Sequence, residues 1–206
     1  MKLQHLLEKS AQHHSHLCPR QILGVRIGLA GMKALDLEAN QGGKRLLVIL
    51  ETDGCFADGV IAATNCTVGH RTLRVEDYGK AAATLIDTRT GQAVRVSPAL
   101  DVRRQACECC PDEPRHYFAQ MEAYRILPDD RLLSIAEVNL GTPVQRIVSR
   151  PGLRVDCAGC GEEIMNEREI LVEGQPFCRS CVGDSYYRLP EQDVILRYEM
   201  QQEPSL

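Results

Sequence analysis

The spacing of apolar residues predicts alternating helices and strands over the larger, N-terminal part of the chain. Apolar residues at helical spacing predict an amphipathic helix over residues 3–12. A second helix is expected over residues 19–37, because Pro19 suits the first helical position and apolar side chains surround much of the circumference. The continuous apolar run at 45–51 predicts a central strand covered on both faces.

Shorter elements follow this strand. Residues 56–63 suit a short helix, and residues 89–92 suit a hairpin turn. The other expected elements are strands over 72–75, 83–87, 93–96 and 132–138 and a helix over 115–125. Strands interspersed with helices predict an α+β fold, a mixed sheet with packed helices.

Three glycines, Gly24, Gly28 and Gly31, interrupt the second helix at three- and four-residue spacing. Each costs about 1 kcal/mol of helix propensity relative to Ala. The cost is understandable if another backbone packs closely against that face, and a second copy of the chain is one source of such a backbone.

A turn separates this region from a compact polar segment rich in Gly and Cys. Pro151 and Gly152 form a strong turn signal. We therefore expect an α+β domain over residues 1–149, followed by a small zinc ribbon and C-terminal tail over residues 150–206.

Charge and composition narrow the class of protein. The 206 residues include 24 Lys and Arg against 28 Asp and Glu, a net charge of -4, which disfavours a generic nucleic-acid binder without excluding a local basic patch. There is no apolar run long enough to cross a membrane and no signal-peptide core at the start. We therefore expect a cytoplasmic protein without a membrane partner, in which the ten cysteines more often hold metal than form disulfides.

Two Cys-x-x-Cys pairs near the C-terminus have the spacing of a four-thiolate zinc site. The predicted ligands are Cys157, Cys160, Cys178 and Cys181. Residues 169–177 suit a small hairpin that leads into the second pair. Since four thiolates fill the tetrahedron, the zinc would be structural, and it would contribute about 10 kcal/mol to folding. Disulfides or incidental thiols are the alternatives.

A second candidate metal site begins at His14, His16 and Cys18. Side chains two positions apart converge only if the chain is extended there, and Pro19 biases Cys18 away from helical geometry. Cys18 would then lie at a helix N-terminus, where the partial positive charge favours a thiolate.

Residues that follow the carboxyl end of the predicted central strand are expected to line the same cleft as His14, His16 and Cys18. Cys55 is a further ligand, and Asp53 either coordinates or orients a histidine. Cys66 is a weaker candidate for the same cleft. A mixed nitrogen and sulfur set suits zinc best, with iron as the alternative. Any one of these residues taken alone is consistent with a structural role.

Cys107, Cys109 and Cys110 form a separate group. Adjacent cysteines rarely share one ion, so either a mobile redox-active or auxiliary metal loop or a set of unrelated thiols fits this pattern.

Several motifs together resemble the FmdE family, which is named for molybdenum formylmethanofuran dehydrogenase. The motifs are His-Ser-His-Leu-Cys-Pro at 14–19, Glu-Thr-Asp-Gly-Cys at 51–55, Asn-Cys-Thr-Val-Gly at 65–69 and Asp-Tyr-Gly-Lys at 77–80. The resemblance covers roughly residues 10–140, and many members carry a following four-cysteine ribbon.

The resemblance implies an α+β core that forms an intertwined homodimer, with a cleft holding His, Cys and Asp residues and a metal. It also implies a link to formylmethanofuran dehydrogenase, a molybdenum or tungsten enzyme. Tyr78 and Lys80 match the family's Asp-Tyr-Gly-Lys segment, so Lys80 either pairs with an anionic ligand, transfers a proton or is simply exposed. The chain departs from the family at Ser15 and Arg20, where small glycines are commoner, and at the group around Cys107.

Three functions remain open from the sequence. The first is a metal-binding accessory protein of molybdenum or tungsten enzyme metabolism, whose cleft holds a metal or a metal-cofactor precursor. The second is an enzyme whose cleft metal activates a water for hydrolysis or proton transfer. The third is a regulatory module that docks through its zinc ribbon.

Overall fold

The structure is a computed structural model in which residues 3–12 and 16–188 are described. The chain divides into two compact units, Met1–Val144 and Gln145–Leu206. This division falls just before the turn at which the sequence predicts the domain boundary.

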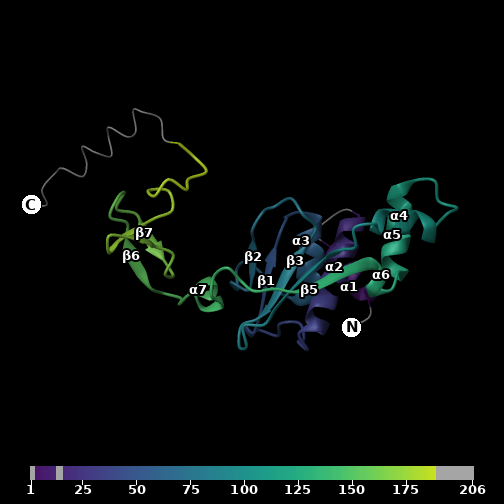
Figure 1. The fold of residues 1–206 in the computed structure, drawn as a ribbon, viewed down its shortest axis with the longest axis horizontal. Helices are drawn as coiled ribbons and strands as arrows, with labels where there is room; N and C mark the ends of the chain where they lie inside the picture. Colours follow the sequence, from purple (N-terminus) through teal and green to yellow (C-terminus); the bar gives the residue numbers. More distant parts are fainter. Residues whose placement is uncertain (1–2, 13–15, 189–206) are drawn as a thin grey trace, which may run out of the picture. The chain divides into compact units, whose positions relative to one another are not determined.

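The first unit contains a five-stranded mixed sheet in the order β2-β1-β3-β4-β5 (Figure 1). Its strands are β1 (Leu46–Leu50), β2 (Leu73–Val75), β3 (Ala83–Asp87), β4 (Ala93–Pro98) and β5 (Leu133–Glu137). β1 pairs in parallel with β2 and antiparallel with β3, and the remaining pairs are antiparallel. The prediction of an interior strand at β1 is confirmed, as is the α+β class.

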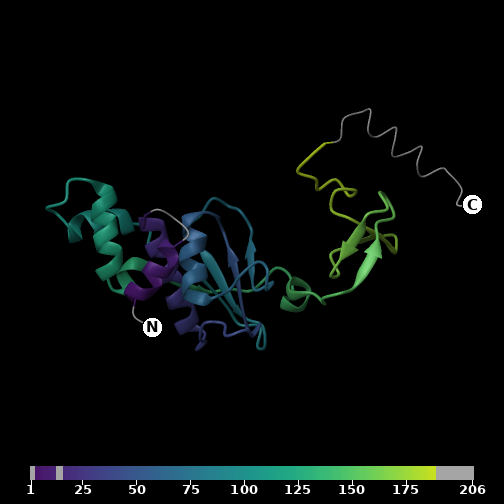
Figure 2. The same ribbon diagram turned by 180° about the vertical axis from the view of Figure 1, so that it is seen from behind.

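The helices of this unit are α1 (Leu3–Ala11), α2 (Pro19–Ala34), α3 (Cys55–Thr64), α4 (Val102–Cys109), α5 (His116–Ile126) and α6 (Asp129–Leu132). Figures 1 and 2 show α1, α2 and α3 on one side of the sheet, with α4 and α5 side by side beyond them. The sequence predicted α1, α2, α3 and α5 but not α4 or α6.

The core lies between the sheet and α2. Alternate residues of β1, Leu46, Val48 and Leu50, pack with buried side chains of α2 such as Ile22 and Ile27. α2 is buried on more than one side, as the sequence predicted. The apolar faces of sheet and helices therefore exclude water from one another, which is the main force holding this unit together.

α2 and α3 pack backbone against backbone through glycines. A Cβ on Gly24 would lie 2.3 Å from the carbonyl oxygen of Phe56, and one on Gly59 would lie 2.2 Å from that of Gln21. Further along α2, a Cβ on Gly28 would lie 2.8 Å from the Cβ of Ala63. The contacts advance in the same direction along both helices, so the helices are parallel and begin at the same end.

This contact explains why Gly24 and Gly28 occur within the predicted second helix. The close backbone at Gly24 comes from α3 of the same chain, so a second copy of the chain is not needed there. Gly31 instead accommodates the side chain of Leu85 on β3, whose Cδ1 would lie 2.3 Å from an added Cβ.

Arg26 fixes α5 alongside α2. Its guanidinium is largely buried and donates to the carbonyl oxygens of Tyr124 at 2.9 Å and Leu127 at 2.6 Å, and it pairs with Asp129 at 2.7 Å. At the other end of α5, the hydroxyl of Tyr117 donates to the carbonyl of Leu17 at 3.3 Å. α5 therefore also runs parallel to α2, with its first turn beside the start of α2.

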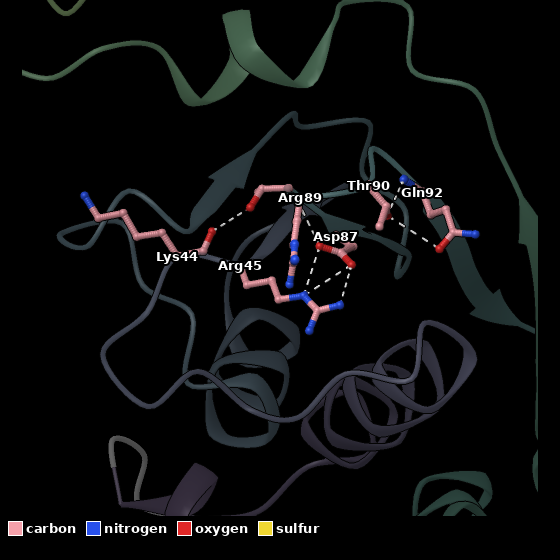
Figure 3. A network of polar contacts seen from close by, with 7 residues as sticks. Lys44, Arg45, Asp87, Arg89, Thr90 and Gln92 are labelled. Carbon is pink, nitrogen blue, oxygen red and sulfur yellow. Dashed lines mark hydrogen bonds and ion pairs between the residues drawn. The ribbon is translucent and has the colours of Figure 1, made fainter.

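A polar network closes the turn between β3 and β4 (Figure 3). The side chain of Asp87 is only 2% exposed, and it accepts hydrogen bonds from the Arg45 guanidinium and from the backbone N–H of Arg89 at 2.9 Å. The hydrogen bonds from Arg45 lower the pKa of the Asp87 carboxyl. The network keeps this end of the sheet in register, far along the strands from the predicted cleft.

The second unit consists mainly of two short hairpins. The first pairs β6 (Arg154–Asp156) with β7 (Glu163–Met165), and the second pairs β8 (Ile170–Val172) with β9 (Gln175–Phe177). α7 (Val144–Val148) spans the division between the units. The hairpin predicted over residues 169–177 is confirmed. Among the described residues of this unit, Cys157 and Ile164 are the only buried apolar side chains.

Substitution of Gly24 by Ala tests the contact between α2 and α3. The added methyl group meets a backbone carbonyl that cannot move independently, and this overpacking outweighs the gain in helix propensity. We expect the free energy of unfolding of the first unit to fall by about 2 kcal/mol in chemical denaturation.

Gly43→Ala is the matched control, because nothing lies within 4 Å of a Cβ at that position. It should change the free energy of unfolding by no more than about 0.5 kcal/mol. A Gly24→Ala protein as stable as the parent would show that the close packing is wrong.

Candidate metal centres

Four cysteines of the second unit lie together. Their Sγ atoms are all within 4.8 Å of one another, and the residues are Cys157, Cys160, Cys178 and Cys181. Cys157 and Cys160 follow β6, whereas Cys178 and Cys181 follow β9. Two backbone N–H groups donate to the Cys157 sulfur, from Cys178 at 3.2 Å and from Gly159 at 3.4 Å. Each Cys-x-x-Cys turn thus aims both of its thiols at the same point.

The glycine between the first two cysteines is required by this packing. A Cβ on Gly159 would lie 3.0 Å from the Cys181 sulfur and 3.3 Å from the Phe177 ring. A side chain there would displace a predicted ligand.

The pKa values of the clustered thiols indicate that all four can be thiolates only with a cation among them. Burial raises the pKa of Cys157, but the N–H groups of Cys178, Cys160 and Gly159 outweigh it and lower the pKa to about 6. Burial, followed by contacts with other thiols of the cluster, raises the pKa of Cys181 well above its usual range. Four sulfurs this close cannot all be thiolates unless a positive ion lies between them, and a tetrahedral set of four thiolates fits a structural zinc ion.

In the first unit, the structure brings Cys18 and Cys55 together. Cys18 is buried at the N-cap of α2, and Cys55 is the partly buried first residue of α3. The two thiols are close enough to interact, since burial, followed by the interaction with Cys18, raises the pKa of Cys55. The parallel packing of α2 and α3 places these two distant residues side by side.

A residue that the sequence did not single out lies beside this pair. Tyr117, in the first turn of α5, is close enough to both thiols that they contribute, after burial, to raising the pKa of its hydroxyl. The N-terminal ends of α2, α3 and α5 therefore meet around Cys18, Cys55 and Tyr117. No local pattern marks Tyr117, because its position depends on Arg26 at the far end of α5.

A buried glutamine holds Cys18 in place. The side chain of Gln21 accepts a hydrogen bond from the Cys18 N–H at 2.8 Å and donates to the Ser10 carbonyl of α1 at 3.0 Å. The backbone of Cys18 is extended, with φ -127° and ψ 161°, as Pro19 predicted. His16 precedes it and is exposed, and His14 lies outside the described residues.

Tyr78 and Lys80 lie at the same end of the sheet as Asp53. The backbone N–H groups of both residues donate to the carbonyl of Glu51, at 2.9 and 3.1 Å, just past the end of β1. Asp53 follows in the turn before α3, and its side chain is exposed. The Lys80 ammonium lies 5.9 Å from the centre of the Tyr78 ring, and both side chains are exposed.

Cys66 does not belong with these residues. It follows the C-terminal end of α3, one helix length from Cys55, and is fully buried. Its sulfur accepts a hydrogen bond from the Asn40 amide at 3.1 Å and donates to the Leu46 carbonyl at 3.5 Å, at the start of β1. The prediction that Cys66 lines the same cleft is wrong, because the helix between the two cysteines carries Cys66 to the opposite end, where it is buried against the start of β1.

Cys107 and Cys109 lie on a helix, so the mobile loop, one of the two alternatives left open by the sequence, is not what the structure has. They occupy the last turn of α4, and Cys110 caps it. The Cys107 sulfur is 3.0 Å from Nδ1 of His116, the first residue of α5. Cys110 contacts the Cys109 thiol and the Glu122 carboxylate.

Within the described residues, the four-cysteine cluster is the one group of three or more Cys, His, Asp or Glu ligand atoms that lie this close together. Cys18 and Cys55 are two ligands rather than three, so among the described residues they do not form such a group. A cavity of about 540 Å³ lies at the opposite end of α2, beside Leu35 and the β3–β4 turn, and no Cys or His is among its described lining residues. This cavity therefore has none of the thiol or imidazole ligands that a zinc site of the predicted kind needs.

Comparison with family models matches both units. Residues 13–134 match FmdE, described as molybdenum formylmethanofuran dehydrogenase operon. Residues 150–187 match the prokaryotic dksA/traR C4-type zinc finger. The second match covers all four clustered cysteines and supports zinc in the ribbon.

Two known proteins are similar over nearly the whole chain. A probable S-adenosyl-L-methionine-binding protein of Archaeoglobus fulgidus is 38% identical over 219 residues, covering 94% of this chain, which spans 57% of that relative's length. A tungsten formylmethanofuran dehydrogenase FmdE-like protein from Syntrophus aciditrophicus has a similar fold, with a TM-score of 0.58 and 24% identity. That match covers 91% of this chain and 96% of that one.

The helices of the described residues include none that is both long and apolar enough to span a membrane.

Loss of one thiolate should unfold the second unit alone. Its described residues bury almost no apolar surface, so metal binding supplies most of its folding free energy, about 10 kcal/mol in comparable zinc peptides. We expect Cys178→Ser to abolish the protected amide protons of the second unit in hydrogen exchange, while those of the first unit stay protected.

Acid should have the same effect on the unsubstituted protein. Protons compete with zinc for the four thiolates, so lowering the pH should release the ion and unfold this unit together. The N–H groups that lower the pKa of the metal-free Cys157 thiol to about 6 favour its thiolate, the form that binds zinc. A second unit that stays folded in Cys178→Ser, or that stays folded after acid has released its zinc, would contradict a metal-dependent fold.

Proposed function

Because the chain belongs to the FmdE family and carries a C4-type zinc finger, we propose that it is a metal-binding accessory protein. The proposal places it in molybdenum or tungsten formylmethanofuran dehydrogenase-type metabolism. Its first unit would hold a metal or a metal-cofactor precursor, and its zinc ribbon would be structural.

The observation that carries the proposal is the contact between Cys18 and Cys55. Two thiols from distant parts of the sequence meet at the start of two helices. Two thiols that interact across the starts of two helices could serve as two ligands of one ion. Thiolates favour zinc or iron over magnesium or calcium.

The partial charges at the helix ends also bear on a metal ion between Cys18 and Cys55. Each helix carries a partial positive charge of about half a unit at its N-terminus, and three such ends meet here. Burial and the interaction with Cys18 raise the pKa of the Cys55 thiol, and a divalent cation bound between the two sulfurs would stabilise both as thiolates. In the proposed site His14 and His16 supply nitrogen ligands from the segment just before Cys18.

Residues at the end of the sheet would complete the binding site. Asp53 precedes Cys55 by two positions, so it can coordinate the ion or orient a histidine. Tyr78 and Lys80 are fixed to Glu51 by their backbone, which leaves both side chains available to a ligand. The positive charge of Lys80 suits an anionic ligand such as a metal oxyanion.

Metal content of purified protein tests this proposal. With one ion in the ribbon and one between Cys18 and Cys55, we expect about two ions per chain by elemental analysis. Cys18→Ser and Cys55→Ser should each remove one ion and leave the zinc in the ribbon. Cys109→Ser is the control, since Cys109 lies on α4 and should leave both ions in place.

One ion per chain in the parent protein, or two ions in both Cys18→Ser and Cys55→Ser, would contradict the proposed site. Circular dichroism of each variant shows whether the first unit has remained folded.

We also propose that the protein is a cytoplasmic homodimer, as the family resemblance implies. The outer edge of β5 supports this, because the strand is at the end of the sheet and Ile135 is 46% exposed. Unpaired strand edges are ready sites of association. Light scattering should give twice the chain mass of 22.9 kDa, and a value equal to one chain would contradict the dimer.

A further inference from the structure

The α4–α5 hairpin holds a thiol–imidazole pair outside the proposed metal sites. The Cys107 sulfur and Nδ1 of His116 are 3.0 Å apart, which is a short hydrogen bond for sulfur. Cys107 is half-buried, and His116 is exposed at the start of α5. A thiol with an imidazole in direct contact has a base that can take its proton as the sulfur attacks.

The two neighbouring cysteines lie in different surroundings. Cys109 and Cys110 pack against the apolar core, whereas Cys107 does not. Burial, followed by the Cys109 thiol and the Glu122 carboxylate, raises the pKa of Cys110 to about 11. Cys110 therefore stays protonated at neutral pH, and Cys107 is the thiol of this group with an imidazole beside it.

We propose that Cys107 and His116 form a peroxide-reactive thiol site in which Cys110 is the resolving thiol. The substrate class is a small hydroperoxide, which can reach a half-buried sulfur. None of its three residues is among those proposed to hold a metal.

The proposed reaction has two steps. In the first, the Cys107 sulfur attacks the terminal peroxide oxygen, the O–O bond breaks, and the thiol proton passes through His116 to the leaving oxygen. The products are a sulfenic acid and water or an alcohol. In the second, the Cys110 sulfur attacks the sulfenic sulfur and displaces hydroxide, which leaves as water with the Cys110 proton. The two thiols are oxidised to one disulfide, and the peroxide is reduced.

The geometry of the helix end selects Cys110 rather than Cys109. Residues three apart lie on the same face of a helix, with Cβ atoms about 5–6 Å apart, while residues two apart point away from each other. Cys110 is the C-cap, with φ -127° and ψ 66°, so its backbone lies outside the regular helix. A small backbone change there can bring its sulfur to bonding distance of the Cys107 sulfur.

The experiment uses the full zinc-loaded chain treated with hydrogen peroxide, quenched at intervals with an alkylating agent and mapped by peptide mass spectrometry. We expect a Cys107–Cys110 disulfide to form. His116→Gln should slow the oxidation of Cys107 at least about tenfold, because the general base is lost. Since His116 is exposed, this variant should remain folded.

Two further variants separate the roles of the neighbouring thiols. Cys110→Ser should stop at the sulfenic acid on Cys107, which a 1,3-diketone probe traps. Cys109→Ser is the matched control from the same turn, and it should form the Cys107–Cys110 disulfide at the parent rate.

Oxidation of Cys107 at the parent rate in His116→Gln would overturn the proposed site. A disulfide that joins Cys107 to Cys109, or no trapped sulfenic acid in Cys110→Ser, would overturn the assignment of the resolving thiol.

Discussion

The close parallel packing of α2 on α3 is the contact on which the proposed site of the first unit depends. Gly24 and Gly59 let the two backbones approach to a distance that any side chain would prevent. The glycines weaken the helices locally, but burial of the surrounding apolar surface offsets this. The parallel direction brings both N-termini to one end, and Arg26 holds α5 in the same direction. Cys18 and Cys55 meet as a result.

The two units differ in how much their folds depend on metal. The second unit has almost no buried apolar side chains among its described residues, so its four thiolates and their ion replace a core. The first unit has an extensive core and positions Cys18 and Cys55 by packing alone. An ion at the proposed site of the first unit would therefore be able to bind or leave without loss of the fold, as the proposed accessory role requires.

Much of this could be predicted from the sequence, because it depends on local pattern. The apolar runs located α2 and β1, and the paired Cys-x-x-Cys spacing located the ribbon. α4 was missed because its apolar residues are few and its cysteines suggested a loop. Tyr117 and the burial of Cys66 depend on how α3 and α5 are packed, and no nearby residues encode that. Whether His14 and His16 join Cys18 stays a prediction.

The most direct measurement of the central claim is a crystal structure of the protein purified with its native metal, with anomalous diffraction collected at the metal edge. We expect an anomalous peak about 2.3 Å from the sulfurs of both Cys18 and Cys55, in addition to one in the ribbon. A map with a peak in the ribbon alone, and with the two thiols in contact with each other and no ion, would contradict the proposed site.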